Sequence, residues 1–89
     1  MVSRALILVV DDDTAVLNSL GFMLETEGFE VSTFSDIGEL LHADSIREAN
    51  CLVVDYLMPA MNGFDVLRAL RNRQITAPAI LITPRRPIP

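Results

Sequence analysis

Several residue types and segments are scarce in this 89-residue chain, and each scarcity excludes a class of protein. Cys51 is the only cysteine, which excludes an intramolecular disulfide and a metal site built from several cysteines. No apolar run is long enough to cross a membrane, and the one at residues 5–10 is too short for a signal peptide. These features predict a soluble, cytoplasmic protein with a single small domain.

Positive charge is also scarce. Seven basic residues, all arginine, stand against twelve acidic residues, so the net charge is −5 and the isoelectric point is about 4.5. A nucleic-acid-binding surface needs clustered positive charge, so we expect no direct nucleic-acid binding. Lysine is absent altogether, so neither this chain nor a second copy of it can supply an ammonium side chain to a site.

Two short apolar segments run straight into aspartate. Ile7–Val10 precedes Asp11 and Asp12, and Cys51–Val54 precedes Asp55. Apolar runs with β-branched residues are typical of strands buried on both faces of a sheet, and ligands bind beyond the carboxyl ends of such strands. Neighbouring strands would place Asp11, Asp12 and Asp55 in one small space. The simpler alternative is that they are solvated acidic strand ends.

The rest of the chain alternates between strand and helix patterns. Residues 29–34 and 78–82 have the composition of further strands, and residues 29–34 suit a sheet edge. Apolar residues at three- and four-residue spacings predict a buried face on each of three connecting helices. The alternation predicts an α/β fold with a parallel sheet. The predicted buried helix faces consist of Val16, Leu17, Leu20, Met23 and Leu24; Ile37, Leu40 and Leu41; and Phe64, Val66, Leu67 and Leu70.

Local signals mark the ends of these helices. Asp13 is a candidate N-cap of the first helix and Ser35-Asp36 of the second, because short oxygen-bearing side chains accept free N–H groups at a helix start. Gly28 suits the left-handed position that follows a helix, and Gly63 allows a positive φ or a close backbone approach. Residues 43–50 are polar and predict a loop or a frayed turn. The third helix is predicted to carry a solvated row of arginines, namely Arg68, Arg71 and Arg73.

The acidic residues indicate phosphoryl chemistry. Carboxylate oxygens suit a hard cation such as Mg²⁺, which also accepts a phosphate oxygen. Asp55 stands alone at its strand end and is the best nucleophile for a phosphoryl group, and Thr83 can donate its hydroxyl to a phosphoryl oxygen. A phosphohydrolase that used Asp55 as nucleophile would need a second acid two residues on, and position 57 is leucine.

Three motifs carry a family resemblance. They are Ile7–Asp12, the pattern D-x-x-M-P-x-M-x-G at Asp55–Gly63, and Ala79–Thr83. In these motifs the chain resembles the receiver domain of two-component response regulators. The resemblance implies a receiver over residues 1–83, with a flavodoxin-like, doubly wound sheet of four strands in the order 2-1-3-4, and a proline-rich tail at 84–89. It implies a signalling domain that at most catalyses its own phosphorylation and dephosphorylation.

The resemblance also implies a role for each site residue. Asp55 corresponds to the phospho-acceptor, and Asp12 and Asp55 to side-chain ligands of Mg²⁺. The backbone carbonyl of Leu57 joins them, and Asp11 binds the metal through water. Thr83 corresponds to the switch residue that moves toward the phosphoryl group. A sensor histidine kinase or a phosphotransfer protein is the implied donor.

Two departures from the family put these roles in question. The family sheet has a fifth strand that begins with a lysine, and this chain has neither, so it looks like a truncated receiver or a fragment. Arg85 or Arg86 would be a poor copy of a buried ammonium. Pro84 stands where the family uses a backbone N–H as a phosphoryl donor. The alternative is therefore a degenerate receiver that acts as a phosphorylation-independent dimerisation or interaction module.

The missing fifth strand has a structural consequence. Without it, the edge of the fourth strand is bare, and Ile80 and Ile82 lose their cover. Exposed apolar edges pair with other chains. We therefore expect a homodimer through the fourth-strand edge and the side of the third helix, with two-fold symmetry.

Overall fold

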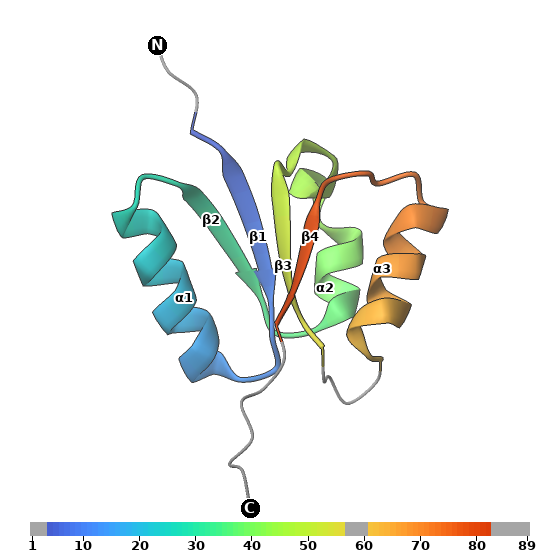
Figure 1. Ribbon diagram of the computed structural model, residues 1–89, viewed down its shortest axis with the longest axis horizontal. Helices are drawn as coiled ribbons and strands as arrows, with labels where there is room; N and C mark the ends of the chain where they lie inside the picture. Colours follow the sequence, from blue (N-terminus) through green and yellow to red (C-terminus); the bar gives the residue numbers. More distant parts are fainter. Residues whose placement is uncertain (1–3, 57–60, 83–89) are drawn as a thin grey trace, which may run out of the picture.

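A four-stranded parallel sheet forms the centre of the molecule. The computed structural model describes residues 4–56 and 61–82. The strands lie in the order β2-β1-β3-β4, which confirms the α/β fold and the strand order predicted above (Figure 1). The strands are β1 (Leu6–Val10), β2 (Glu30–Phe34), β3 (Cys51–Asp55) and β4 (Ala79–Ile82).

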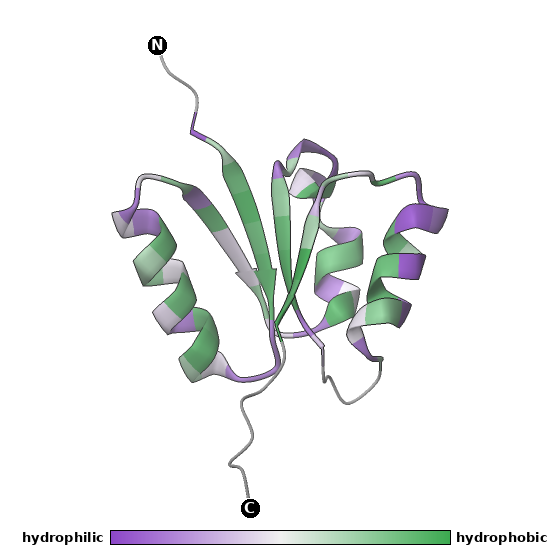
Figure 2. Cartoon of the chain, viewed as in Figure 1, coloured by the Kyte–Doolittle hydropathy of each residue, from purple (hydrophilic) through white to green (hydrophobic). Residues whose placement is uncertain are grey.

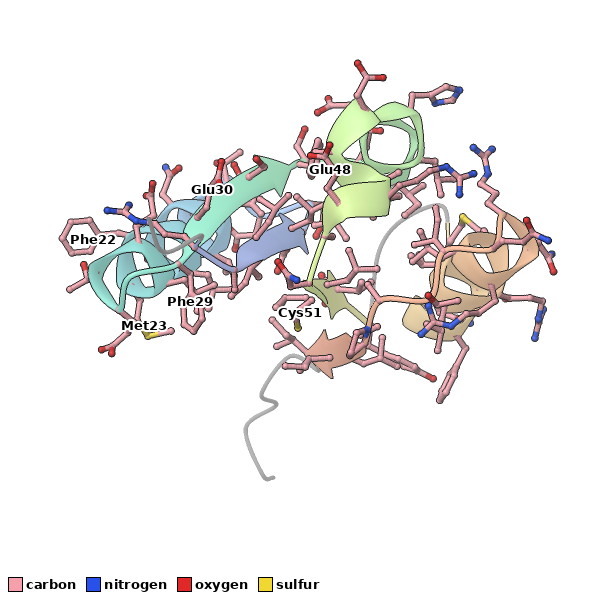
Figure 3. All side chains as sticks on the ribbon, turned by 90° about the horizontal axis from the view of Figure 1, so that it is seen from above. Phe22, Met23, Phe29, Glu30, Glu48 and Cys51 are labelled. Atoms are coloured by element: carbon pink, nitrogen blue, oxygen red, sulfur yellow. The ribbon has the colours of Figure 1, made fainter. Side chains whose placement is uncertain are left out.

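Helices cover the sheet from both sides. Figure 3, which looks along the strands, shows α1 on one side and α2, the 3₁₀-helix η1 and α3 on the other. The helices are α1 (Thr14–Thr26), α2 (Ile37–His42), η1 (Asp44–Glu48) and α3 (Gly63–Asn72). The loop or frayed turn predicted at residues 43–50 is thus largely helical. Ile46 is buried there, and its packing holds the turn in place.

The predicted helix caps are confirmed. Asp13 accepts hydrogen bonds from the N–H groups of Ala15 and Val16 at 2.9 and 3.4 Å, and Asp36 accepts one from Glu39 at 2.9 Å. Gly28 follows α1 with φ of +98°, a conformation that costs glycine least. The cap at Asp13 fixes the point where the chain leaves β1 and enters α1.

The core has two parts, one on each face of the sheet. Alternate residues of β1 point to opposite faces, so Leu8 packs toward α2 and α3 while Val9 packs toward α1. Both side chains are buried. Figure 2 shows the resulting pattern, with hydrophobic strands at the centre and hydrophilic residues on the outer faces of the helices.

The cover on the α1 side is incomplete. The helix α1 packs against β1 and β2. Among the described residues, no helix lies on this side over β3 and β4. Cys51, which opens a strand predicted to be buried on both faces, is accordingly only half-buried, and Ile80 is 57% exposed. The open part of this face adjoins the outer edge of β4.

Two residues assigned to buried helix faces are in fact exposed. Met23 is 52% exposed, because it lies about 120° around the helix axis from the buried Leu17. Phe64 is 57% exposed and lies about 160° from Val66, on the opposite side of α3. Its ring packs edge-to-face on Tyr56 instead, with ring centroids 5.6 Å apart.

The predicted arginine row is exposed at all three positions, and two of its members also bond to backbone carbonyls. The Arg71 guanidinium donates hydrogen bonds to the carbonyls of Ile75 and Ala77, at 2.6 and 3.0 Å. Arg73 donates to Leu41 at 3.4 Å. These two side chains fasten the end of α3 to its surroundings. Arg68 instead forms a surface ion pair, with an N–O distance of 3.6 Å to Asp65.

Candidate functional site

Three carboxylates meet at the carboxyl ends of β1 and β3. Val10 is in register with Val54, so the residues that follow or end these two strands lie side by side. The ligand oxygens of Asp11, Asp12 and Asp55 lie within 4.8 Å of one another. The structure therefore brings together the three acids that the sequence motifs singled out.

Backbone contacts fix the position of Asp11. Its N–H donates to the Phe34 carbonyl at 3.1 Å, which extends the pairing of β1 and β2 by one residue. Its carboxylate accepts the N–H of Asp13 at 2.9 Å. Asp11 and Asp55 are buried and Asp12 is exposed, so the group opens to solvent through Asp12.

The electrostatics of the group favour a cation. Burial raises the pKa of Asp11 above that of a free aspartate, and the negative charges of Asp55 and Asp12 raise it further. The hydrogen bond from Asp13 opposes this rise but does not cancel it. A divalent cation between the carboxylates would remove the repulsion. Three carboxylates, one of them reachable from water, fit Mg²⁺, which binds few protein oxygens and keeps several waters.

A backbone clamp holds the residue next to Asp55. The N–H of Tyr56 donates to the Ile82 carbonyl at 2.7 Å, and the Tyr56 carbonyl accepts the N–H of Gly63 at 2.8 Å. A Cβ on Gly63 would lie 3.1 Å from the Tyr56 Cα and 3.0 Å from a Leu81 methyl. Of the two roles predicted for Gly63, close backbone approach is the one the structure shows. The clamp ties the end of β3 to β4 and to the start of α3.

Sequence reasoning missed two residues of this region. Tyr56 joins both sides of the clamp through its backbone, and no sequence pattern distinguishes such a role. Asn62 caps α3 by accepting the N–H of Asp65 at 2.9 Å. The signal for Asn62 was available, because asparagine immediately before an apolar helical pattern is a common N-cap.

Five residues to which the sequence analysis assigned a role lie outside the described part of the chain, as does the whole proline-rich tail. They are Leu57, Thr83, Pro84, Arg85 and Arg86. The nearest described neighbours are informative, since Ile82 is in register with Asp55 and ends β4 beside it. The carboxyl ends of β1, β3 and β4 therefore meet at the acidic group.

A family profile for the response regulator receiver domain matches residues 7–88. The chain belongs to this family. Receivers are signalling domains of two-component systems, they typically bind Mg²⁺, and they interact with histidine kinases or phosphotransfer proteins. In the described part of this receiver, no helix has the length and apolar character needed to cross a membrane.

Individual relatives agree with the family assignment. The receiver is 33% identical over 89 residues to the transcriptional regulatory protein FixJ of Bradyrhizobium diazoefficiens. The alignment covers all of this chain and 43% of FixJ. Its fold matches the crystal structure of FixJ-N with a TM-score of 0.79 and 33% identity, over 92% of this chain and 66% of that one. It thus spans less than half the length of this curated relative.

A second similar structure was solved with Mg²⁺ bound. The receiver matches the response regulator protein TrrA from Thermotoga maritima, solved in complex with Mg²⁺-BeF, with a TM-score of 0.80 and 30% identity. The match covers 90% of this chain and 70% of that one. The two chains share the fold on which TrrA holds its metal complex.

Proposed function

We propose that this receiver binds Mg²⁺ through Asp11, Asp12 and Asp55 and accepts a phosphoryl group on Asp55. The observation that carries the proposal is the meeting of these three carboxylates, with ligand atoms within 4.8 Å, at the carboxyl ends of β1 and β3. The donor we propose is a phosphohistidine on a sensor histidine kinase or a phosphotransfer protein.

The proposed transfer assigns a task to each acid. A carboxylate oxygen of Asp55 forms a bond to phosphorus, the bond from phosphorus to the donor nitrogen breaks, and that nitrogen keeps the electron pair. Asp12 and Asp55 bind the metal directly and Asp11 binds it through water. When bound, Mg²⁺ neutralises charge and lets the anionic phosphoryl group approach the carboxylates. We assign the third direct protein ligand to the Leu57 carbonyl and a phosphoryl contact to Thr83.

The clamp around Tyr56 supports this role for Asp55. In-line transfer depends on positioning of the nucleophile, and a displacement of about 1 Å can cost a large part of the rate. Tyr56 is bonded through its backbone to Ile82 on one side and to Gly63 on the other. Asp55 is therefore held at a strand end that two neighbouring elements fix in place.

A second candidate function is an interaction module that works without phosphate. The sequence favours it at one point, since Pro84 stands where a backbone N–H to the phosphoryl group is expected. A further partner that we propose under either function is another copy of this chain, bound along β4. We expect neither direct nucleic-acid contact nor membrane attachment by residues 1–89.

The deciding experiment is phosphorylation by a small phosphodonor in the presence of Mg²⁺, read by intact mass. We expect one phosphoryl adduct on the wild-type chain, none on Asp55→Asn, and an unchanged adduct on the control Asp44→Asn, which alters an exposed acid in η1. Absence of an adduct under conditions that label an ordinary receiver would reject phosphoryl transfer and leave the interaction module as the function.

A further inference from the structure

The start of α3 contains the one Asn-Gly sequence of the chain, at Asn62 and Gly63. Asparagine is a thermolabile residue, because the backbone nitrogen of the next residue can attack its side-chain carbonyl carbon. Glycine hinders this attack least, since it has no side chain. The other asparagines precede larger residues, namely serine after Asn18, cysteine after Asn50 and arginine after Asn72. Asn62 is therefore the asparagine most open to this reaction in an unfolded chain.

Three features of the folded chain oppose the reaction. The Gly63 N–H, which must lose its proton before the nitrogen attacks, donates to the Tyr56 carbonyl at 2.8 Å. The Asn62 Oδ1 accepts the N–H of Asp65 at 2.9 Å, which holds the side chain in place as a cap. Ring closure also requires the Asn62 Cβ and the Gly63 nitrogen to eclipse each other about the Cα–C bond. At the ψ of 170° they are staggered, so the reacting atoms are misaligned.

We propose that Asn62 is a site of spontaneous deamidation and that the backbone clamp around Tyr56 controls its rate. When the clamp opens, the deprotonated Gly63 nitrogen forms a bond to the Asn62 Cγ. The bond from Cγ to Nδ2 breaks, and Nδ2 takes up one proton and leaves as ammonia. Water then opens the cyclic imide at either of its two carbonyls. One product is aspartate, and the other is isoaspartate, in which the backbone runs through Cβ and Cγ.

The two products differ in what they do to the clamp. Aspartate keeps the normal backbone and is as good an N-cap as asparagine. Isoaspartate adds one methylene to the backbone directly before Gly63, where there is no room for it. A single Cβ on Gly63 would already lie 3.1 Å from the Tyr56 Cα and 3.0 Å from a Leu81 methyl. An isoaspartyl chain therefore cannot close the clamp, and the modification permanently marks a chain that has opened.

The first test compares the four asparagines in the folded chain and in urea, at mildly alkaline pH. Digestion followed by mass spectrometry quantifies aspartate and isoaspartate at each position. We expect Asn62 to deamidate fastest of the four in urea, and at least about tenfold more slowly in the folded chain. The control Asn62→Ser keeps a good N-cap and should lack the fast-reacting position. Equal Asn62 rates in both states, or a faster asparagine elsewhere in urea, would overturn the proposal.

Two destabilised variants distinguish opening of the clamp from global unfolding. Leu81→Ala removes the side chain that packs at Gly63, whereas Val31→Ala removes a half-buried side chain of β2 on the α1 side of the sheet. The two are compared at urea concentrations that give them equal free energies of unfolding. Leu81→Ala should then deamidate at Asn62 several times faster than Val31→Ala. Equal rates would mean that only global unfolding exposes the site, and would reject control by the clamp.

A third test addresses the two products. A sample that has been deamidated in urea and then refolded contains both of them. Pulse proteolysis should remove the isoaspartyl chains at lower urea than the aspartyl chains, and Asn62→Asp should behave like the aspartyl chains. Equal resistance of the two products would reject the exclusion of isoaspartate by the clamp. Because these measurements involve neither metal nor phosphoryl chemistry, their failure leaves the Asp55 adduct as a separate question.

Discussion

At the scale of single residues, Asp11 connects the stability of the fold to the chemistry of the site. Burial raises its pKa, and the neighbouring charges of Asp55 and Asp12 add to the effect. The folded chain therefore holds the Asp11 proton more tightly than the unfolded chain does. An unligated receiver carries an electrostatic cost at neutral pH that a bound cation removes.

This cost predicts a particular pH dependence. Because the folded pKa of Asp11 is raised, its contribution to stability is lost as the pH rises from the ordinary aspartate range through that folded pKa. Asp11→Asn should remove this loss and raise the free energy of unfolding at neutral pH, since its amide oxygen still accepts the N–H of Asp13. Urea unfolding in a chelator across this pH range measures the effect, with Asp44→Asn as control. Identical pH profiles for wild type and Asp11→Asn would contradict the prediction.

We predict that alanine substitution at two glycines, Gly63 and Gly21, changes the free energy of unfolding in opposite directions. A Cβ on Gly63 would press on the Tyr56 backbone, so Gly63→Ala should lose about 1–3 kcal/mol of unfolding free energy. A Cβ on Gly21, inside α1, would meet only the Thr33 methyl at 3.5 Å, and Gly21→Ala should gain about 0.5–1 kcal/mol from helix propensity. Chemical denaturation of both variants checks the pair, and equal shifts would argue against the clamp.

At the scale of elements, the path from α3 to β4 depends on one arginine. Arg71 satisfies the carbonyls of Ile75 and Ala77, and Ile75 is itself buried. Arg71→Gln should therefore cost about 1–2 kcal/mol of unfolding free energy. Arg68→Gln removes only a surface ion pair with Asp65 and should cost less than about 0.5 kcal/mol. Urea unfolding of the two variants measures both losses. A larger loss for Arg68→Gln than for Arg71→Gln would contradict the prediction.

The elements were predictable where the signal is local. Asp13 and Gly28 marked the two ends of α1, because capping depends on a few adjacent residues. Periodicity misassigned Met23 and Phe64, since spacing alone does not fix the centre of a buried face. The burial of Ile46 depends on distant strands and helices, and a polar local sequence conceals it.

At the scale of the whole molecule, metal binding should stabilise the fold. A ligand that binds only the folded chain adds about 1.4 kcal/mol when present at ten times its dissociation constant. Mg²⁺ should therefore raise the thermal midpoint of the wild type and do so much less for Asp12→Asn. Because the charge of Asp12 repels Asp11, this variant should be slightly more stable than the wild type without metal, so the effect of Mg²⁺ is measured for each protein against its own metal-free midpoint. A midpoint that does not respond to Mg²⁺ would count against the metal site.

The strand order and the acidic group were predictable from sequence at this scale, and the surroundings of the group were not. Alternating patterns and the family motifs were enough to place Asp11, Asp12 and Asp55 together. The clamp was not visible, because it links Tyr56 to Ile82 through backbone atoms that every residue carries. Side-chain identity predicts where chemistry gathers, and the backbone contacts that hold it follow only from the folded chain.

The central position of β1 affects how the chain folds during synthesis. Ile7 lies between Val31 and Cys51 in the sheet, yet it precedes both in sequence. At about 5–20 residues per second, roughly 2–9 s pass between the synthesis of Ile7 and that of Cys51. During this time the most apolar strand has one flank bare. We expect a nascent chain to gain resistance to protease at β1 only after β3 has left the ribosome.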